Sequence, residues 1–540
     1  MERNVITKID TTTIDNYYDN DRISDLPDFI AHHILSFLVD SPKELIRTSV
    51  LSKKWLALTA SFPILHFNLE SFDKAIYPSW APFDRQYSKK IFFKYIAYTI
   101  SRFSQHQNVI NANTFDLRAE LEDPAHADIM NRCLGFVLKP GLQVFAIYSC
   151  GRHRYSVPPP MYRLPNVLLS VSSLTSLSIR DCELPSLLIA GDGDVVRFKL
   201  LKMLNLDDVY LNEEMIKCLT AGCPLLEEFR VCRCYGFKRL CVYGLQNLQK
   251  VEVYYTSEVE EIDIQAPNLS DIFLSDMNAK GVPPCINLFS GKTLSMIFYG
   301  CFSEQFAVSL SNFPFLETLI LKLSYDHTIL KLSSHSLRTL SLDTQIDLED
   351  IEIDTPNLLY FQYSSRCSNV HRPIRNSGES KACMECYPDL DCDTIWFQQF
   401  RRFLDKTIAF KVLKLHICTN NTDVEELKLL EWPPFELEHI ELNVRGISEL
   451  SEYLPVLEAV LWCCRPRSLT LKSFNFYNDI ERRNQVVKFT YEKLLQQEDK
   501  GKTNIQIMFS TVKACGSHDL LITFLKEEVN HKASLEARYE

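Results

Sequence analysis

The sequence predicts an α/β protein built in three parts. A three-helix module is expected at residues 21–68, a curved solenoid of parallel strands at 112–475, and a helical cap at 476–540. Three observations predict this order: apolar residues at helical spacing in the first part, a leucine-rich pattern that returns through the second, and an amphipathic run in the third. The remaining segments are expected to be a disordered tail at 1–20 and a connecting helical segment at 69–111.

The helical module is predicted from apolar side chains that recur at three- and four-residue steps. They form two runs and lead into a third, and are Leu26, Ile30, Ile34, Leu35 and Leu38, then Leu45, Val50 and Leu51, then Trp55. Asp25 and Pro27 stand where a helix start is expected, since a proline near the first turn loses no hydrogen bond. Fewer than fifty residues cannot enclose all these side chains, so the module is expected to need a partner.

The sequence of this module resembles the F-box, which joins a protein to the Skp adaptor of cullin-RING ubiquitin ligases. The match lies at Leu26-Pro27, Ile34 to Leu38 and Ser52 to Trp55, while Phe29 and Ala31 depart from the usual pattern. The resemblance implies a set of residues that pack on or support the adaptor: Leu26, Pro27, Ile30, Ile34, Leu35, Leu38, Leu45, Val50, Leu51 and Trp55. The alternative is an ordinary three-helix core.

Composition narrows the function classes. A chain of 540 residues suggests several domains or one elongated repeat domain. With 69 acidic and 58 basic residues and no dense basic block, neither nucleic acid nor a membrane is expected as a partner. The polar first twenty residues carry no apolar signal core, so an intracellular protein of the cytoplasm or nucleus is expected. The 18 cysteines are then expected to be small buried residues and not disulfides.

A repeat of the form leucine-x-x-leucine-x-leucine decides the fold of the second part. Its units begin at Leu142, Leu174, Leu201, Leu226, Leu248, Leu269, Leu294, Leu316, Leu337, Leu358, Phe410, Leu437 and Pro466. Apart from one step of 52 residues after Leu358, they are 21 to 32 residues apart, which is the period of leucine-rich repeats. Each unit should supply one strand whose fourth and sixth residues point inward, and stacked units then bury a continuous core.

Cysteines take two kinds of position in this pattern. Four fall at the ninth position of a repeat, where an inward residue is expected: Cys150, Cys182, Cys234 and Cys418. Others lie in the long step, which we predict to be an inserted loop at 364–394 followed by a helix carrying Trp396, Phe397, Phe400, Phe403 and Leu404. This loop holds Cys367, His371, Cys383, Cys386 and Cys392, but their spacing does not match a second zinc-ligand pair. We therefore expect no metal and no cofactor.

The outward fifth positions predict where a target could bind. Most are polar, but Phe273, Phe298 and Ile320 are apolar in three successive units, and Met296 lies beside them. Neighbouring strands are about 4.8 Å apart, so these side chains would form an apolar ladder. Exposed apolar patches of this kind often mark contact sites.

Over nearly its whole length the chain resembles plant F-box proteins with leucine-rich repeats, including the wording at Cys223 to Glu228. The resemblance implies a non-catalytic substrate receptor of an SCF-type ubiquitin ligase that binds a Skp-family adaptor, through it a cullin, and an unknown protein target. No phosphate loop, metal-binding histidine pair or nucleophile elbow occurs. Two alternatives stay open. One is a small-molecule (hormone) sensor, which would require a basic pocket, although the outward basic residues of the repeats are widely scattered. The other is a non-ligase scaffold that binds the adaptor alone.

Overall fold

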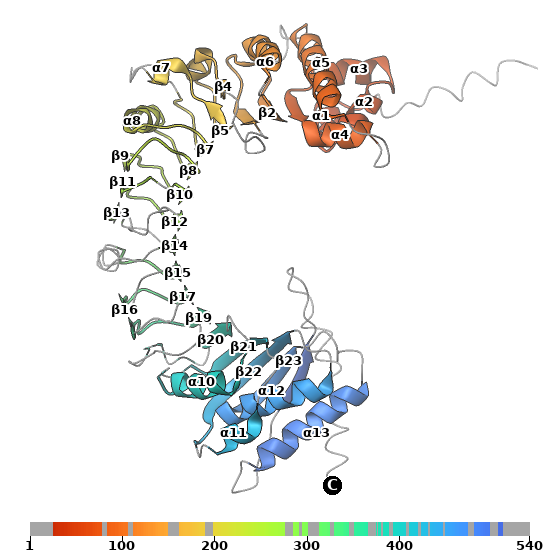
Figure 1. Cartoon of the computed structure of the whole chain (residues 1–540). Coiled ribbons are helices and arrows are strands. Elements are labelled where there is room, and N and C mark those ends of the chain that lie inside the picture. The colour runs from red at the N-terminus through yellow and green to blue at the C-terminus, as the bar shows by residue number, and fades with distance from the viewer. Residues whose placement is uncertain are drawn as a thin grey trace, which may run out of the picture. The chain divides into compact units, whose positions relative to one another are not determined.

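The fold was analysed in a computed structural model (Figure 1). It describes residues 25–77, 84–105, 112–121, 123–149, 161–189, 198–256, 258–275, 285–290, 294–300, 313–323, 329–344, 350–364, 374, 376–377, 379, 382–387, 392–406, 410–418, 423–429, 432–445, 449–472, 480–496 and 506–510. The chain forms two compact units, Met1–Phe237 with Cys241–Leu248 and Lys238–Leu240 with Gln249–Glu540, so the division falls inside the predicted solenoid.

The first unit begins with the helical module, which has helices α1 (Asp28–Ser36), α2 (Pro42–Thr48) and α3 (Lys53–Ala60). Helix α1 starts two residues later than Asp25 would place it, because the carbonyl of Pro27 accepts hydrogen bonds from the amides of Ile30 and Ala31 at 3.0 and 3.1 Å. At α3 the Ser52 side chain accepts a hydrogen bond from the Trp55 amide and caps the helix. The three predicted helices are thus present.

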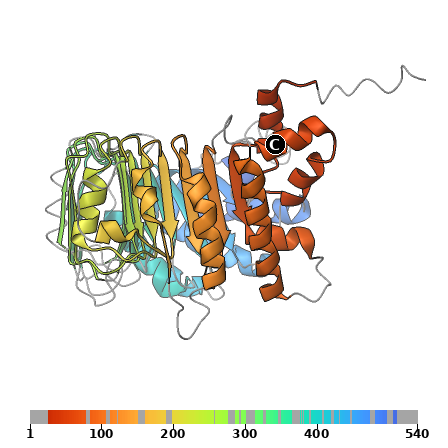
Figure 2. The ribbon, with the colours of Figure 1, turned by 90° about the horizontal axis from the view of Figure 1, so that it is seen from above.

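Parallel strands follow in the first unit, in the order β1 (Ile64–Asn68), β2 (Thr114–Ala119), β3 (Val144–Ser149), β5 (Ser176–Arg180), β7 (Met203–Asp207) and β8 (Glu228–Cys232). A short pair, β4 (Tyr162–Arg163) and β6 (Cys182–Glu183), lies apart from them. The helices are α4 (Leu69–Ile76), α5 (Arg85–Ser104), α6 (Pro124–Val137), the 3-10 turn Asn166–Ser170, α7 (Ser186–Ile189) and α8 (Glu213–Ala221). Figure 2 shows the strands side by side with helices packed along them. The sheet therefore begins at Ile64, earlier than the predicted start at 112.

The second unit continues the repeat with β10 (Lys250–Tyr254), β12 (Asp271–Ser275), β14 (Ser295–Gly300), β15 (Thr318–Leu323), β17 (Thr339–Thr344), β19 (Tyr360–Ser364), β20 (Cys383–Tyr387), β21 (Val412–Cys418), β22 (Phe435–Arg445), β23 (Cys464–Lys472) and β24 (Gln506–Ser510). Each strand pairs in parallel with the next. Four helices cover one side of its last strands in Figure 1: α10 (Thr394–Lys406), α11 (Val424–Lys428), α12 (Leu450–Cys463) and α13 (Ile480–Gln496).

The second unit also has a second set of strands that the repeat pattern did not predict. β11 (Glu261–Gln265) pairs with β13 (Cys285–Phe289), and β16 (Ile329–Ser333) pairs with β18 (Asp350–Asp354), while β9 (Arg239–Tyr243) lies where the two units divide. Most of these strands lie in repeats of 21 or 22 residues, which leave little chain for a helix between successive strands, whereas the 25-residue repeat that begins at Leu201 holds α8. In these units a short alternating strand takes the place of the helix.

The predicted register is confirmed in every repeat but one. The exception is the unit at Leu294, where Ile272 pairs with Met296 and Leu274 pairs with Phe298, so the inward residues are Met296 and Phe298. The prediction placed Ile297 inward, and it was wrong by one residue. Because Met296, Ile297, Phe298 and Tyr299 are all apolar or aromatic, apolar alternation could not distinguish the two registers, and a one-residue shift exchanges the faces.

The segment predicted as an inserted loop contains a strand. β20 pairs with β19 on one side and β21 on the other, so Cys383 and Cys386 belong to the sheet. Cys386 pairs with the inward Tyr363, whereas Cys383 pairs with the outward Tyr360, and the two thiols therefore lie on opposite faces. Cys367 and His371 lie outside the described residues. The helix predicted after the loop is confirmed as α10.

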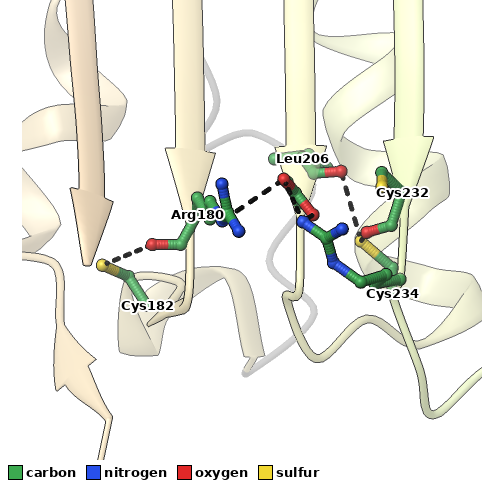
Figure 3. Close-up of polar contacts among 7 residues, drawn as sticks. Arg180, Cys182, Leu206, Cys232 and Cys234 are labelled. Carbon is green, nitrogen blue, oxygen red and sulfur yellow. Dashed lines mark hydrogen bonds and ion pairs between the residues drawn. The ribbon is translucent and has the colours of Figure 1, made fainter. Parts of the chain in front are cut away.

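Two of the ninth-position cysteines show why a small inward donor is used there (Figure 3). The Cys182 thiol donates to the Arg180 carbonyl at 3.3 Å, and the Cys234 thiol donates to the Leu206 carbonyl at 3.4 Å. Both side chains are buried, so these bonds satisfy carbonyls at the ends of strands. The expected structural role is confirmed for these two. Cys150 and the side chain of Cys418 lie outside the described part of the chain.

Candidate functional site

The helical module leaves a set of large apolar side chains in contact with solvent. Of the predicted adaptor residues, Val50 is 79% exposed, Leu51 is 62% exposed and Ile34 is 38% exposed. Pro27 is also exposed, and four others are half-buried: Leu26, Ile30, Leu38 and Leu45. Four apolar residues that were not predicted are exposed as well: Phe29, Phe37, Ile46 and Leu56. Patches this apolar on so small a module are typical of protein contact surfaces.

Two of the ten predicted residues have a different position. Leu35 is 0% exposed and Trp55 is 2% exposed, and both belong to a core formed with Ala31, Leu58 and Phe62. The module's own side chains cover them, so of the two roles that the resemblance implies, packing on the adaptor or supporting that surface, the structure favours the supporting one. Adaptor contact by the other eight stays a prediction.

The aromatic strand face is the second candidate surface, and it consists of Tyr254, Phe273, Ile297, Tyr299 and Ile320. Phe273 pairs with Ile297, and Ile297 pairs with Ile320, on the strand face opposite the core. The Phe273 ring meets Tyr254 and Tyr299 edge to face, with ring centroids 5.7 and 5.5 Å apart. All five side chains are half-buried, so part of each is accessible.

This surface replaces the predicted target-binding ladder in part. Phe273 and Ile320 have the expected outward position, but Phe298 is 1% exposed and Met296 is 0% exposed, so both are core residues. Ile297 takes the place predicted for Phe298. Tyr254 was missed because it occupies the last outward position of its strand, beyond the fifth position of its repeat. Tyr299 was missed because the predicted register placed it inward as a sixth position.

Short hydroxyl side chains and ion pairs border the aromatic strand face. Ser295, Thr318 and Ser341 occupy neighbouring outward positions. Glu252 pairs with Phe273 and forms an ion pair with Lys250 at 2.6 Å, while Lys322 pairs with Tyr299 and lies 3.5 Å from Asp343. Aromatic rings among short hydroxyl side chains can bind apolar groups and donate hydrogen bonds. The arrangement is suited to contact with a protein surface.

The buried thiols do not form a nucleophile. Burial raises the pKa of Cys223 and of Cys234 to about 12, and it also raises the pKa of Cys463. A protonated thiol is a poor nucleophile and a poor metal ligand. Among the described residues no three His, Cys, Asp or Glu side chains are arranged to hold a metal ion.

Comparison with known proteins finds relatives named for an F-box and for leucine-rich repeats. Residues 104–325 match a family model described as the LRR domain of At1g61320/AtMIF1. F-box/LRR-repeat protein 25 of Arabidopsis thaliana is 25% identical over 268 residues, which are 48% of this chain and 88% of that protein. F-box/FBD/LRR-repeat protein At4g00160 of the same plant is 24% identical over 444 residues, covering 76% of this chain and 89% of that protein.

The chain is similar to plant F-box/leucine-rich-repeat proteins. A further relative, F-box/LRR-repeat protein At3g62440 of Arabidopsis thaliana, is 28% identical over 281 residues and aligns over 55% of its own length. In this comparison the helical module corresponds to the F-box, and the two sets of parallel strands correspond to the repeats. No helix in the described part of the chain has both the length and the apolar composition that crossing a bilayer requires.

Proposed function

We propose that this protein is the substrate-recognition subunit of an SCF-type ubiquitin ligase. The F-box would bind a Skp-family adaptor, and through it a cullin, while the repeats hold a target protein. The observation that carries the proposal is the F-box surface, where Val50 and Leu51 stay exposed although Leu35 and Trp55 close the core beneath. A folded module with its own core does not need these exposed apolar side chains for its stability. A partner protein that covers them would explain why they are there.

The receptor would act by proximity. A target held on the repeats brings its lysines to activated ubiquitin at a high effective concentration, so no residue of this chain has to react. The high pKa values of the buried thiols support a non-catalytic role. Because its ligase partners act inside the cell, we propose that the protein works in the cytoplasm, the nucleus or both.

The target would bind the aromatic strand face. It combines three aromatic rings with two aliphatic side chains and has no charge among its five members. Aromatic residues are enriched at the energetic centres of protein interfaces, because each buries a large area at low entropic cost.

Co-purification with a Skp-family adaptor and a cullin tests the docking end. Val50→Asp and Leu51→Asp place a carboxylate in the apolar surface and should abolish co-purification without unfolding the protein. Leu429→Asp is the matched control, since Leu429 is 80% exposed in the second unit. Retention of the adaptor by both F-box variants would refute the proposed docking surface. An adaptor bound without a cullin would indicate a scaffold and not a ligase subunit.

Capture of targets tests the other end. A protein lacking the F-box should retain targets without degrading them, and Phe273→Ser should reduce the captured amount. Phe289→Ser is its control, because Phe289 is 68% exposed on β13, in the second set of strands. Equal capture by wild type and Phe273→Ser would show that the target binds elsewhere. A thermal shift on adding candidate hormones would favour a small-molecule sensor.

A further inference from the structure

An arginine cluster lies near the carboxyl ends of the strands in the first unit. We propose that this cluster binds carboxylates of an acidic segment in the target protein. The inference rests on the proposed function, because it assumes that the repeats hold a target. It adds the chemistry of the bound segment, which the relatives' names do not state.

The cluster is organised around one carboxylate. Arg233 donates through Nη2 to both oxygens of Asp207, at 2.6 and 2.7 Å, and the Arg180 Nε lies 3.5 Å from Asp207 Oδ2 (Figure 3). One aspartate thus fixes two guanidinium groups from different strands. Each keeps exposed surface, since the Arg180 and Arg233 side chains are 40% and 36% exposed while Asp207 is 15% exposed.

Strand register extends the cluster toward the F-box. Arg180 pairs with Tyr148, and Tyr148 pairs with Arg118, whose guanidinium lies over the Tyr148 ring at 5.0 Å. Arg118 is 50% exposed and forms an ion pair with Asp116 at 3.4 Å. On the other side the exposed Arg230 pairs across the strands with Asn205. Neighbouring strands therefore present four arginines along one edge of the face.

The backbone at the strand ends explains why Arg233 reaches Asp207. Arg233 follows β8 directly and has a φ of 49°, in the left-handed region that most residues avoid. Asp181 and Asp208 hold the same conformation after β5 and β7. Val231 points inward and Cys232 pairs with Asp207, so strict alternation would turn Arg233 inward. The left-handed residue leaves this alternation, and Arg233 reaches Asp207.

Acidic side chains balance the cluster, but they lie beneath its surface. Asp181 and Asp208 are 4% and 8% exposed, and Asp116 and Asp207 are mostly buried. At the strand ends Arg118, Arg180 and Arg233 keep exposed surface while the mostly buried Asp116 and Asp207 hold them in place. Guanidinium forks bind carboxylates with two parallel hydrogen bonds, and held arginines lose little freedom on binding. A protein segment is the proposed occupant, because the inference assumes that the repeats hold a protein target.

Fluorescence anisotropy of the full chain tests the inference. The probe is a labelled short peptide with glutamate at every second position, compared with its glutamine counterpart. Arg180→Gln and Arg233→Gln should each weaken binding of the glutamate peptide about tenfold. Arg132→Gln is the matched control, since it removes the same charge from an exposed position on α6. Asp207→Asn should strengthen binding of the glutamate peptide. If the ion pairs of Asp207 with Arg180 and Arg233 were purely structural, the same substitution would only lower the thermal stability of the protein.

Several results would overturn the inference. One is a glutamate peptide that does not saturate the protein below about 1 mM. Another is an equal loss in Arg132→Gln, which would indicate nonspecific attraction. A third is preferential binding of a phosphoserine peptide or of oligothymidylate over the glutamate peptide. Adaptor co-purification of the arginine variants separates the two claims: if the adaptor is retained while the peptide fails, only the acidic-segment inference falls, and if wild type binds no adaptor, the proposed function falls.

Discussion

The rings of Phe273 and Tyr299 meet edge to face, with centroids 5.5 Å apart and planes inclined at 75°. They project from neighbouring strands, on the opposite side of the sheet from the buried Phe298. The contact depends on the register of β14, because a shift of one residue would turn Tyr299 into the core and Phe298 outward. The position of one strand therefore decides which aromatic residues a target can reach.

Alanine substitutions on the two faces should report this register. Phe298→Ala removes a core side chain and leaves a cavity, which typically lowers the free energy of unfolding by about 3 to 5 kcal/mol. Phe273→Ala removes a half-buried side chain and should cost about 1 kcal/mol through its lost ring contacts. Chemical denaturation of both variants measures the difference. Similar losses in the two variants would show that Phe298 is not in the core.

Core substitutions in the F-box should act by unfolding and not by direct loss of contact. Leu35→Ala and Trp55→Ala each remove a fully enclosed side chain from a five-residue core, at a cost of about 2 to 5 kcal/mol. A module this small has little stability to lose, so hydrogen exchange should become fast throughout α1 to α3. Adaptor binding should fall as a consequence. Normal exchange protection together with lost binding would instead make these residues direct contacts.

The sequence predicted most of the fold because leucine-rich repeats have a strict inward pattern. Leu177, Phe229 and Leu340 are inward as expected, and the outward residues on either side of each are polar. Prediction failed where that contrast disappears. Around Phe298 both strand faces are apolar, and before β20 the polar stretch at 364–382 hid a single strand in which Met384 and Cys386 are buried.

The candidate sites were less predictable than the fold. Exposure of Val50 and Leu51 agrees with the F-box resemblance, but periodicity could not show that Leu35 and Trp55 lie in the core, because contact and core residues share the same apolar types. Arg233 was missed for another reason. It follows the strand in a left-handed conformation, and neither alternation nor repeat spacing identifies such a residue.

Burial of His439 should make stability depend on pH. Burial lowers the pKa of His439, and the positive charges of Lys414 and Lys472 lower it further. The negative charge of Glu441 raises this pKa, but the net effect is a decrease. The unfolded chain then binds a proton more readily, so this histidine's contribution to stability is complete above its ordinary pKa of about 6.5 and is lost as pH falls toward the lower folded pKa. His439→Gln should lose less stability than wild type between pH 7.5 and 5.5. A constant difference between the two proteins across this range would contradict the prediction.

Thiol labelling should separate the cysteines by burial. Cys285 is exposed on β13, whereas Cys234 is buried and its pKa is raised to about 12, so on the order of one Cys234 thiol in ten thousand is ionised at pH 8. Since the thiolate is the reactive form, iodoacetamide should modify Cys285 in the native protein and leave Cys234 unmodified. Peptide mass spectrometry resolves the two sites, and labelling in denaturant provides the control, because both should then react. Equal native labelling would mean that the turn after β8 opens readily, which would also release the Arg233 contact to Asp207.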